Sequence, residues 1–153
     1  MTSGSSLAVV GKSVPRIEGI EKVTGQAKFT GDLVIAGMLE GKVLRSPYPH
    51  AVIESIDLTR AKDLPGVVAI LTRDDVQDID PYYGHCLRDR PLIALDRVRY
   101  VGEPVAAVAA IDGATAEEAL SLLHVRYKEL PSVAEVGEAL SSGAPILHEQ
   151  IPQ

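Results

Sequence analysis

The sequence predicts a domain built around one buried β-strand and the helix that follows it. Residues 105–110 are an unbroken run of small and β-branched apolar side chains, which is typical of a strand covered on both faces. Before this run, Gly102-Glu103-Pro104 predicts a turn, because glycine tolerates turn dihedrals and proline has no N–H. After it, Thr115-Ala116-Glu117-Glu118 matches a capping box and predicts the start of a helix. Together they predict a packed α/β unit that the rest of the chain must cover.

The N-terminal quarter has a different character. Residues 1–10 are expected to be a disordered tail, because they are terminal and begin with a Ser/Gly-rich stretch. Residues 11–25 combine glycine, proline and mixed charges, and we expect an extended arm that another surface must hold in place. Alternation of Ala27, Phe29 and Gly31 predicts a weak strand over 26–32.

Strands and short helical turns follow in the middle of the chain. A strand over 38–44 ends at Pro47 and Pro49, because two prolines in three residues cannot pair in a ladder. A second strand is expected over 51–58, with Val52, Ile56 and Leu58 on one face and Glu54 as the residue that does not fit. The next expected elements are a helical turn over 59–63, a buried strand over 66–71, a short helix from the Thr72 cap to Val76, and a long loop over 79–90.

The C-terminal third contains the elements that flank the central strand. Residues 97–100 alternate between arginine and apolar side chains, as in a strand with one wet face. The helix that we expect to begin at Thr115 carries an apolar stripe of Ala116, Ala119, Leu120 and Leu123. A further strand is expected over 125–128, and residues 133–140 fit a strand end followed by a short helix.

Composition limits the class of protein. A chain of 153 residues with 46% apolar residues fits one domain over 11–153, with an aliphatic core because there is no Trp and only one Phe. A net charge of −6 disfavours nucleic acid as a partner. The single cysteine excludes an internal disulfide framework and fits a reducing compartment. With no signal sequence or membrane span recognisable, we expect a cytoplasmic protein.

Motifs for phosphate, metal or nucleophilic chemistry are weak. Gly11-Lys12-Ser13 is not a phosphate loop, because Ser6 occupies the position of the first glycine. One cysteine and scattered histidines do not supply a zinc ligand set. The acidic cluster Asp74, Asp75, Asp78 and Asp80 is better explained by a helix start and solvated charge. We therefore predict no catalytic, cofactor-binding or metal-binding residue in this chain.

Two polar projections are the best candidates for a contact surface. Arginine, tyrosine and histidine flank the prolines of the 45–50 corner, and the 82–90 loop has a similar composition. The predicted partner-contact residues are Arg45, Tyr48, His50, Tyr82, His85, Arg88 and Arg90. The alternative is a free-standing small-molecule-binding or cysteine-dependent enzymatic domain that uses the His85-Cys86 loop.

Several ordered motifs resemble the molybdenum-binding large subunit of the xanthine dehydrogenase/aldehyde oxidase family. The resemblance covers nearly everything between Gly11 and Glu149. The motifs are Val14-Pro15-Arg16, residues 21–29 with Asp32, Arg45-Ser46-Pro47-Tyr48-Pro49-His50-Ala51, Leu64-Pro65-Gly66-Val67, residues 97–109, residues 116–120, Tyr127, Leu130-Pro131, Ala144-Pro145 and His148-Glu149.

This resemblance implies an α+β fold, the α/β-hammerhead, with a mixed β-sheet and a few short helices. It implies an oxidoreductase that hydroxylates an aldehyde or N-heteroaromatic substrate. The assembled enzyme would contain molybdopterin, as its cytosine dinucleotide in many bacteria, together with [2Fe–2S] clusters and FAD in partner subunits. The family's cofactor and catalytic segments lie in later domains, so we expect this chain to be an excised first domain or a split first subunit. Its expected role is an assembly module, inactive alone, that clamps the iron–sulfur subunit and walls part of the substrate funnel.

Overall fold

The computed structural model describes residue 7 and residues 9–149, and it divides the chain into two compact units. We call the described residues up to Ala36 the N-terminal unit and those from Gly37 onward the main unit. Most of the tail predicted over 1–10 lies outside the described residues, and the predicted domain over 11–153 stays a prediction. Among the described residues, no helix has the length and apolar character needed to cross a bilayer.

The N-terminal unit contains only short helical elements. Helix α1 spans Gly19–Val23, and a 3₁₀ turn, η1, spans Thr30–Asp32. The strand expected over 26–32 is therefore wrong. The Asp32 carboxylate accepts a hydrogen bond from the Phe29 N–H at 2.9 Å, which closes a turn where an extended strand was expected. No described residue of this unit is buried.

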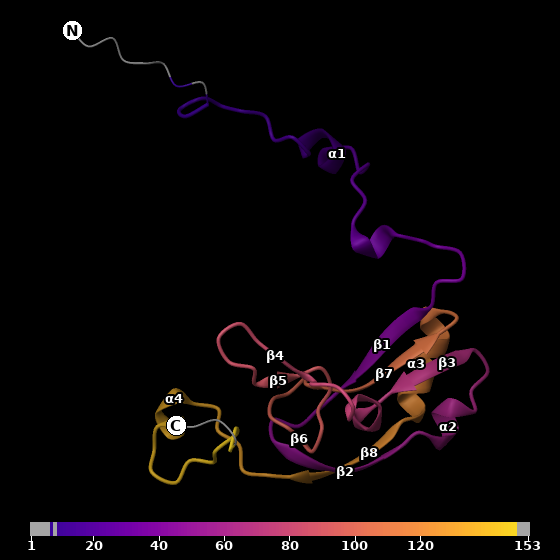
Figure 1. The fold of residues 1–153 in the computed structure, drawn as a ribbon, viewed down its shortest axis with the longest axis vertical. Coiled ribbons are helices and arrows are strands. Elements are labelled where there is room, and N and C mark those ends of the chain that lie inside the picture. The colour runs from indigo at the N-terminus through magenta and orange to yellow at the C-terminus, as the bar shows by residue number, and fades with distance from the viewer. Residues whose placement is uncertain (1–6, 8, 150–153) are drawn as a thin grey trace. The chain divides into compact units, whose positions relative to one another are not determined.

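The main unit is an α+β fold with three antiparallel sheets (Figure 1). One sheet has the order β1-β7-β3, the second β6-β2-β8, and a two-stranded sheet pairs β4 with β5. A mixed sheet was expected, and all the pairings between described strands are antiparallel. The strands are β1 Glu40–Arg45, β2 Ala51–Asp57, β3 Val67–Leu71, β4 Tyr82–Tyr83, β5 Arg90–Pro91, β6 Arg97–Val98, β7 Pro104–Ala110 and β8 His124–Glu129.

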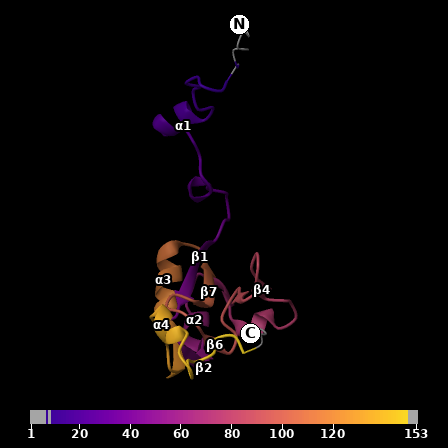
Figure 2. The ribbon, with the colours of Figure 1, turned by 90° about the vertical axis from the view of Figure 1, so that its left-hand side faces the viewer.

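Helices of the main unit cover one face of the first sheet. Helix α3 lies alongside β1 and β7, with the hairpin of β4 on the opposite side in Figure 2. The helical elements are α2 Thr59–Lys62, the 3₁₀ turn η2 Arg73–Val76, α3 Gly113–Leu122 and α4 Val136–Ala139. Strand β7 is central, as its apolar run predicted, and it contributes Ala106 and Val108 to a core shared with Ala119 of α3. The predicted apolar stripe of α3 faces this core.

Three local expectations for the strands are corrected by the pairings. Ala51 and Ile53 are the buried pair of β2, instead of the expected face containing Val52, and the register shift between Ile53 and Ser55 lets Ile56 pack against the same core. Strand β3 is an edge strand with Val68 58% exposed, so it is not the buried strand expected over 66–71. The strand expected over 97–100 is only β6, because the chain turns away after Val98.

Two further corrections concern a cap and a loop. Helix α3 begins at Gly113, two residues before the expected start, because the Asp112 carboxylate accepts a hydrogen bond from the Thr115 N–H at 2.7 Å. The 79–90 segment, expected as a loop, contains β4, which pairs with β5 as a short hairpin. The Thr72 cap is confirmed, because its hydroxyl accepts from the Asp74 N–H.

Candidate functional site

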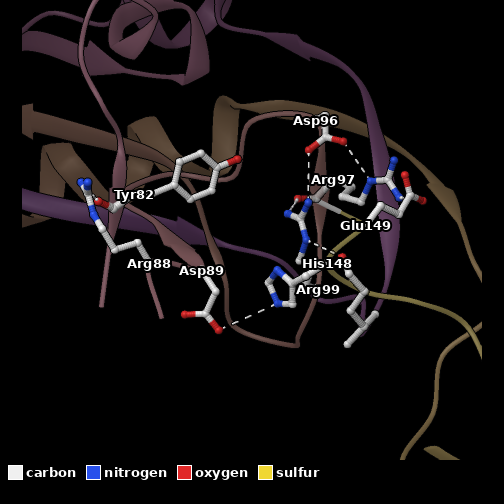
Figure 3. A pocket seen from close by; sticks show the side chains of 9 residues that line it. Tyr82, Arg88, Asp89, Asp96, Arg97, Arg99, His148 and Glu149 are labelled. Atoms are coloured by element: carbon white, nitrogen blue, oxygen red, sulfur yellow. Dashed lines mark hydrogen bonds and ion pairs between the residues drawn. The ribbon is translucent and has the colours of Figure 1, made fainter. Parts of the chain in front are cut away.

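Three segments that are distant in sequence meet at a polar cleft of the main unit. They are the β4–β5 hairpin, the strand and turn over 96–103, and the C-terminal segment 147–149 (Figure 3). A small cavity of about 50 Å³ lies between them. It is lined by Tyr82, Arg88, Asp89, Asp96, Arg97, Arg99, Leu147, His148 and Glu149. The close alternation of acidic and basic side chains makes this cleft strongly charged.

Asp96 organises the two arginines of this cleft. Its carboxylate lies 2.8 Å from Nε of Arg97 and 3.6 Å from Nη2 of Arg99, as the dashed lines of Figure 3 show. Burial acts to raise the pKa of Asp96, but the hydrogen bond from Arg97 and the charge of Arg99 lower the pKa overall. Asp96 therefore stays ionised and holds both guanidinium groups in place.

The two arginines and Asp89 in turn hold the C-terminal segment. Arg99 donates from Nε to the Leu147 carbonyl at 3.0 Å, and Arg97 donates from Nη1 to Glu149 at 3.2 Å. His148 lies between these contacts, with Nε2 at 4.0 Å from a carboxylate oxygen of Asp89. Leu147 and Glu149 are thus held in the cleft by hydrogen bonds, and His148 between them lies near Asp89.

A second cavity, of about 350 Å³, adjoins the first and contains a buried acid. Glu103 is 1% exposed, and its carboxylate accepts a hydrogen bond from the Arg99 N–H. Burial raises the pKa of Glu103, and the Arg99 N–H only partly opposes this effect. The pKa of Tyr100, which also lines the cavity, is raised by burial and by the Glu103 charge.

The turn that carries Glu103 is joined to the 45–50 corner by backbone hydrogen bonds. Gly102 has φ +92°, a conformation that favours glycine, which explains the residue type at this position. Its carbonyl accepts from Nη1 of Arg45 at 2.9 Å, and its N–H donates to the Ser46 carbonyl at 2.8 Å. The Ser46 N–H donates back to the Glu103 carbonyl at 2.9 Å. The Gly-Glu-Pro motif and the proline corner therefore form one structural unit.

The structure separates the residues that were predicted to form the 45–50 projection. Arg45 is exposed, whereas Tyr48 is half-buried and its ring lies 5.1 Å from the ring of Tyr127. His50 is only 4% exposed, and its Nδ1 lies 2.7 Å from the Pro131 carbonyl, so His50 is an interior residue and not part of the protein surface. The contact role of Arg45 stays a prediction.

The residues predicted from the hairpin line three hollows. Tyr82 and Arg88 line the small cavity and Arg90 lines the larger one, so three of the predicted residues belong to the cleft. Arg88 donates to the Tyr82 carbonyl at 2.7 Å and pairs with Asp80 at 2.8 Å. His85 lies elsewhere, in an open hollow that it shares with Cys86. Their role as partner contacts stays a prediction.

Most of the cleft was missed by reasoning from the sequence. Arg97 and Arg99 were assigned to a strand, Glu103 to a turn and all three to a family motif, and Asp96 was given no role. The residues that complete the cleft are Asp89, Leu147, His148 and Glu149. The one available signal was a charged residue between Gly102 and Pro104, where a turn needs no carboxylate.

The described part of the chain has no group of side chains arranged for metal binding or for thiol chemistry. No three His, Cys, Asp or Glu side chains there are grouped so that they could hold a metal ion. Cys86 is exposed, and no hydrogen bond joins it to an imidazole among the described residues. The donor set does not fit molybdenum, so we assign no step of a metal-centred reaction to residues of this chain.

Comparison with known proteins identifies the family. The family model described as aldehyde oxidase and xanthine dehydrogenase, a/b hammerhead domain, matches residues 24–131. The chain is 46% identical to a probable xanthine dehydrogenase component of Bacillus subtilis, over 88% of this chain and 18% of that protein. It is 34% identical to the nicotinate dehydrogenase large molybdopterin subunit of Eubacterium barkeri, over 95% of this chain and 34% of that protein.

Solved structures agree with the sequence relatives. A Cu,Mo-CO dehydrogenase matches with a TM-score of 0.85 and 34% identity, over 94% of this chain and 18% of that chain. Quinoline 2-oxidoreductase from Pseudomonas putida 86 matches with a TM-score of 0.77 and 38% identity, over 88% of this chain and 18% of that chain. The expected hammerhead fold is thereby confirmed. The chain, which spans between about a fifth and a third of these relatives' lengths, is a member of the aldehyde oxidase and xanthine dehydrogenase a/b hammerhead domain family.

Proposed function

We propose that the chain is a structural and assembly module of a molybdenum hydroxylase-type oxidoreductase and is inactive on its own. The enzyme would act on an aldehyde or N-heteroaromatic substrate. Two of the relatives are named for N-heteroaromatic substrates, nicotinate and quinoline. The similarity covers nearly all of this chain but only 18% of the CO dehydrogenase chain, which supports the role of one module within a larger enzyme.

The observation that carries the assembly role is the apolar surface of the N-terminal unit. Ile17 is 98% exposed, Val34 is 90% exposed and Val23 is 86% exposed. A short segment that exposes several large apolar side chains and buries none favours a role in contact with another surface. This unit buries no described residue of its own, so it gains order and buries apolar area when a neighbouring protein surface covers it.

The cofactors and partners follow as proposals from the family. Molybdopterin, as its cytosine dinucleotide, would be held by the remaining domains of the large subunit, and [2Fe–2S] clusters and FAD by partner subunits. The hairpin and the cleft would contribute to the contact with the iron–sulfur subunit and to the wall of the substrate funnel. We place the assembled enzyme in the cytoplasm, because the chain has a single cysteine and needs no disulfide.

Co-purification tests this proposal. The affinity-tagged chain is expressed together with the other domains and subunits of its enzyme, and the purified material is assayed for molybdenum and iron by mass spectrometry. We expect the tag to recover a complex that contains both metals, and the tagged chain expressed alone to contain neither. The proposal is wrong if the chain alone binds molybdenum stoichiometrically or oxidises an aldehyde.

A further inference from the structure

Glu103 is a buried carboxylate with no counter-ion among the described residues. It is 1% exposed, and no described Lys, Arg or His nitrogen lies within 4.0 Å of its carboxylate oxygens. Its side-chain hydrogen bond within the described part of the chain comes from the neutral Arg99 N–H. A buried charge is unfavourable unless an opposite charge and hydrogen bonds compensate it. Glu103 therefore lacks the compensation that a carboxylate in this position needs.

The cationic groups around Glu103 are engaged elsewhere. The guanidinium group of Arg99 is directed to the Leu147 carbonyl at 3.0 Å and to Asp96 at 3.6 Å. His148 lines the same cavity as Glu103, and its Nε2 lies 4.0 Å from a carboxylate oxygen of Asp89. Arg90 is exposed and borders the cavity without pairing with Glu103. Burial raises the pKa of Glu103 by more than the backbone N–H groups of Arg99 and Tyr100 and the charges of Arg99 and His148 lower this pKa.

Space for an added group is present beside Glu103. The cavity of about 350 Å³ that Glu103 lines is on the order of ten times the volume that a water molecule occupies in the liquid. Tyr100 lines it as well, and aromatic faces attract cations. The cavity thus has two carboxylates, those of Glu103 and Asp89, next to the cationic side chains of Arg90 and Arg99, and room for a long side chain.

We propose that this cavity is a socket for a lysine or arginine side chain supplied by another part of the assembled molybdenum enzyme. The inserted cation pairs with Glu103 and lies against Tyr100. The proposal rests on the proposed assembly function and names the contact by which one partner docks. The net charge of −6 favours a basic partner, because complementary charge steers association. Such a partner has a source, because the chain spans only 18% of a similar large chain and most of that enzyme lies outside it.

Removing the charge of Glu103 tests the socket. The Glu103→Gln variant keeps the shape and the acceptor for the Arg99 N–H. Glu118→Gln is the matched control, because Glu118 is exposed on α3 and its carboxylate makes no hydrogen bond with the described residues. Binding of each purified chain to the remaining domains and subunits is measured by calorimetry. We expect Glu103→Gln to weaken binding on the order of 30-fold, as for other buried charge pairs, and the control to bind as the wild type does.

The stability of the isolated chain distinguishes a partner-binding role of Glu103 from a purely structural role. If Glu103→Gln weakens binding only by damaging the turn, the stability of the isolated chain falls together with its binding. If Glu103 awaits a partner cation, Glu103→Gln leaves the isolated chain at least as stable as the wild type while binding falls. If the variant does not fold, hydrogen exchange of the wild-type chain, measured alone and in the complex, tests the proposal instead. Amides of residues 99–103 must become protected in the complex, and unchanged exchange there overturns the proposal.

The outcomes separate this proposal from the assembly function. If the wild-type chain does not bind the remaining enzyme, the assembly function itself fails and the socket fails with it. If the wild type binds and Glu103→Gln binds equally well, only the socket is overturned. Weakened binding with retained stability supports both.

Discussion

At the scale of single residues, the fold buries the carboxylate of Glu103, although burial disfavours the charged form of that carboxylate. Its carboxylate holds the turn by accepting from the Arg99 N–H, yet burial raises its pKa above the ordinary value of 4.5. The folded chain therefore binds this proton more tightly than the unfolded chain does. Between pH 4.5 and the raised pKa, the folded state carries more bound protons, so the contribution of Glu103 to stability decreases as the pH rises through that interval.

The Glu103→Gln variant makes this pH dependence measurable. Glutamine does not titrate, so the free energy of unfolding of the variant minus that of the wild type should increase as the pH rises from about 4.5 towards 8. Denaturant unfolding at several pH values gives this difference directly, with Glu118→Gln as the reference. A difference that is independent of pH would contradict a raised pKa in the folded state.

His50 shows why some single-residue predictions fail. The sequence places it beside two prolines in a polar segment, and such a segment is typical of an exposed turn. Its burial depends on a contact with the Pro131 carbonyl, which lies 81 positions along the chain. Local composition contains no information about that contact.

At the scale of elements, β7 and β3 are neighbours with opposite environments. Both have runs of β-branched and small apolar residues, and the sequence predicts a buried strand for each. Strand β7 pairs on both sides, with β1 and β3, whereas β3 pairs only with β7. Apolar composition identifies a strand but does not say whether it is central or at an edge, because that depends on the order of the strands.

Matched valine-to-alanine substitutions measure this difference. Val108 of β7 is 2% exposed and lies in the core with Ala119, so Val108→Ala should lower the free energy of unfolding by about 2 kcal/mol. Val68→Ala on β3 removes the same atoms from an exposed side chain. This variant should change the free energy of unfolding by less than about 0.5 kcal/mol. Urea unfolding of the two variants checks the prediction. Equal losses of unfolding free energy would contradict the assignment of β7 as a central strand and β3 as an edge strand.

Strand β2 shows a second limit of element prediction. Period-two alternation places Val52 and Ile56 on one face, but the register shift after Ile53 inserts an extra residue near Glu54, so Ile56 packs with Ala51 and Ile53 instead. Glu54 was the residue that did not fit the alternation, so the signal of the irregularity was present. Which side chains of β2 face the core could be determined only from the pairing of β2 with β8.

At the scale of the whole molecule, the N-terminal unit differs from the main unit in the burial of its apolar side chains. The main unit has two buried clusters, one around Val98 and Val105 and one around Val108 and Ala119. The N-terminal unit has exposed isoleucine and valine and no buried residue among those described. The N-terminal unit therefore does not cover its own apolar side chains within the described residues.

A triple substitution in the N-terminal unit tests this use. Ile17→Ser, Ile20→Ser and Val23→Ser together should leave the free energy of unfolding of the chain within about 0.5 kcal/mol per site, because the side chains are exposed. The same variant should bind the remaining enzyme at least about tenfold more weakly, because the lost apolar area no longer contributes. Lys12→Ser with Lys28→Ser is the control, and calorimetry measures both. Unchanged binding of the triple variant would remove the main support for the assembly role.

The cleft could not be predicted from the sequence because its contacts join distant segments. Arg97 reaches Glu149 over 52 positions and Arg99 reaches Leu147 over 48 positions. The central strand, the α3 stripe and the family motifs were predictable, because each is encoded by neighbouring residues. Arg97, Arg99 and Glu103 also lie in the family motif quoted over residues 97–109, but that motif does not indicate that side chains there meet the C-terminal segment.

The exposed position of Cys86, at the tip of the β4–β5 hairpin, has a practical consequence. The sequence has no other cysteine and no tryptophan, so a maleimide dye attached there gives one emitter at one known place, without prior mutagenesis. Energy transfer from tryptophans of an approaching subunit to that dye would then report, in real time, how near the hairpin comes to its neighbour.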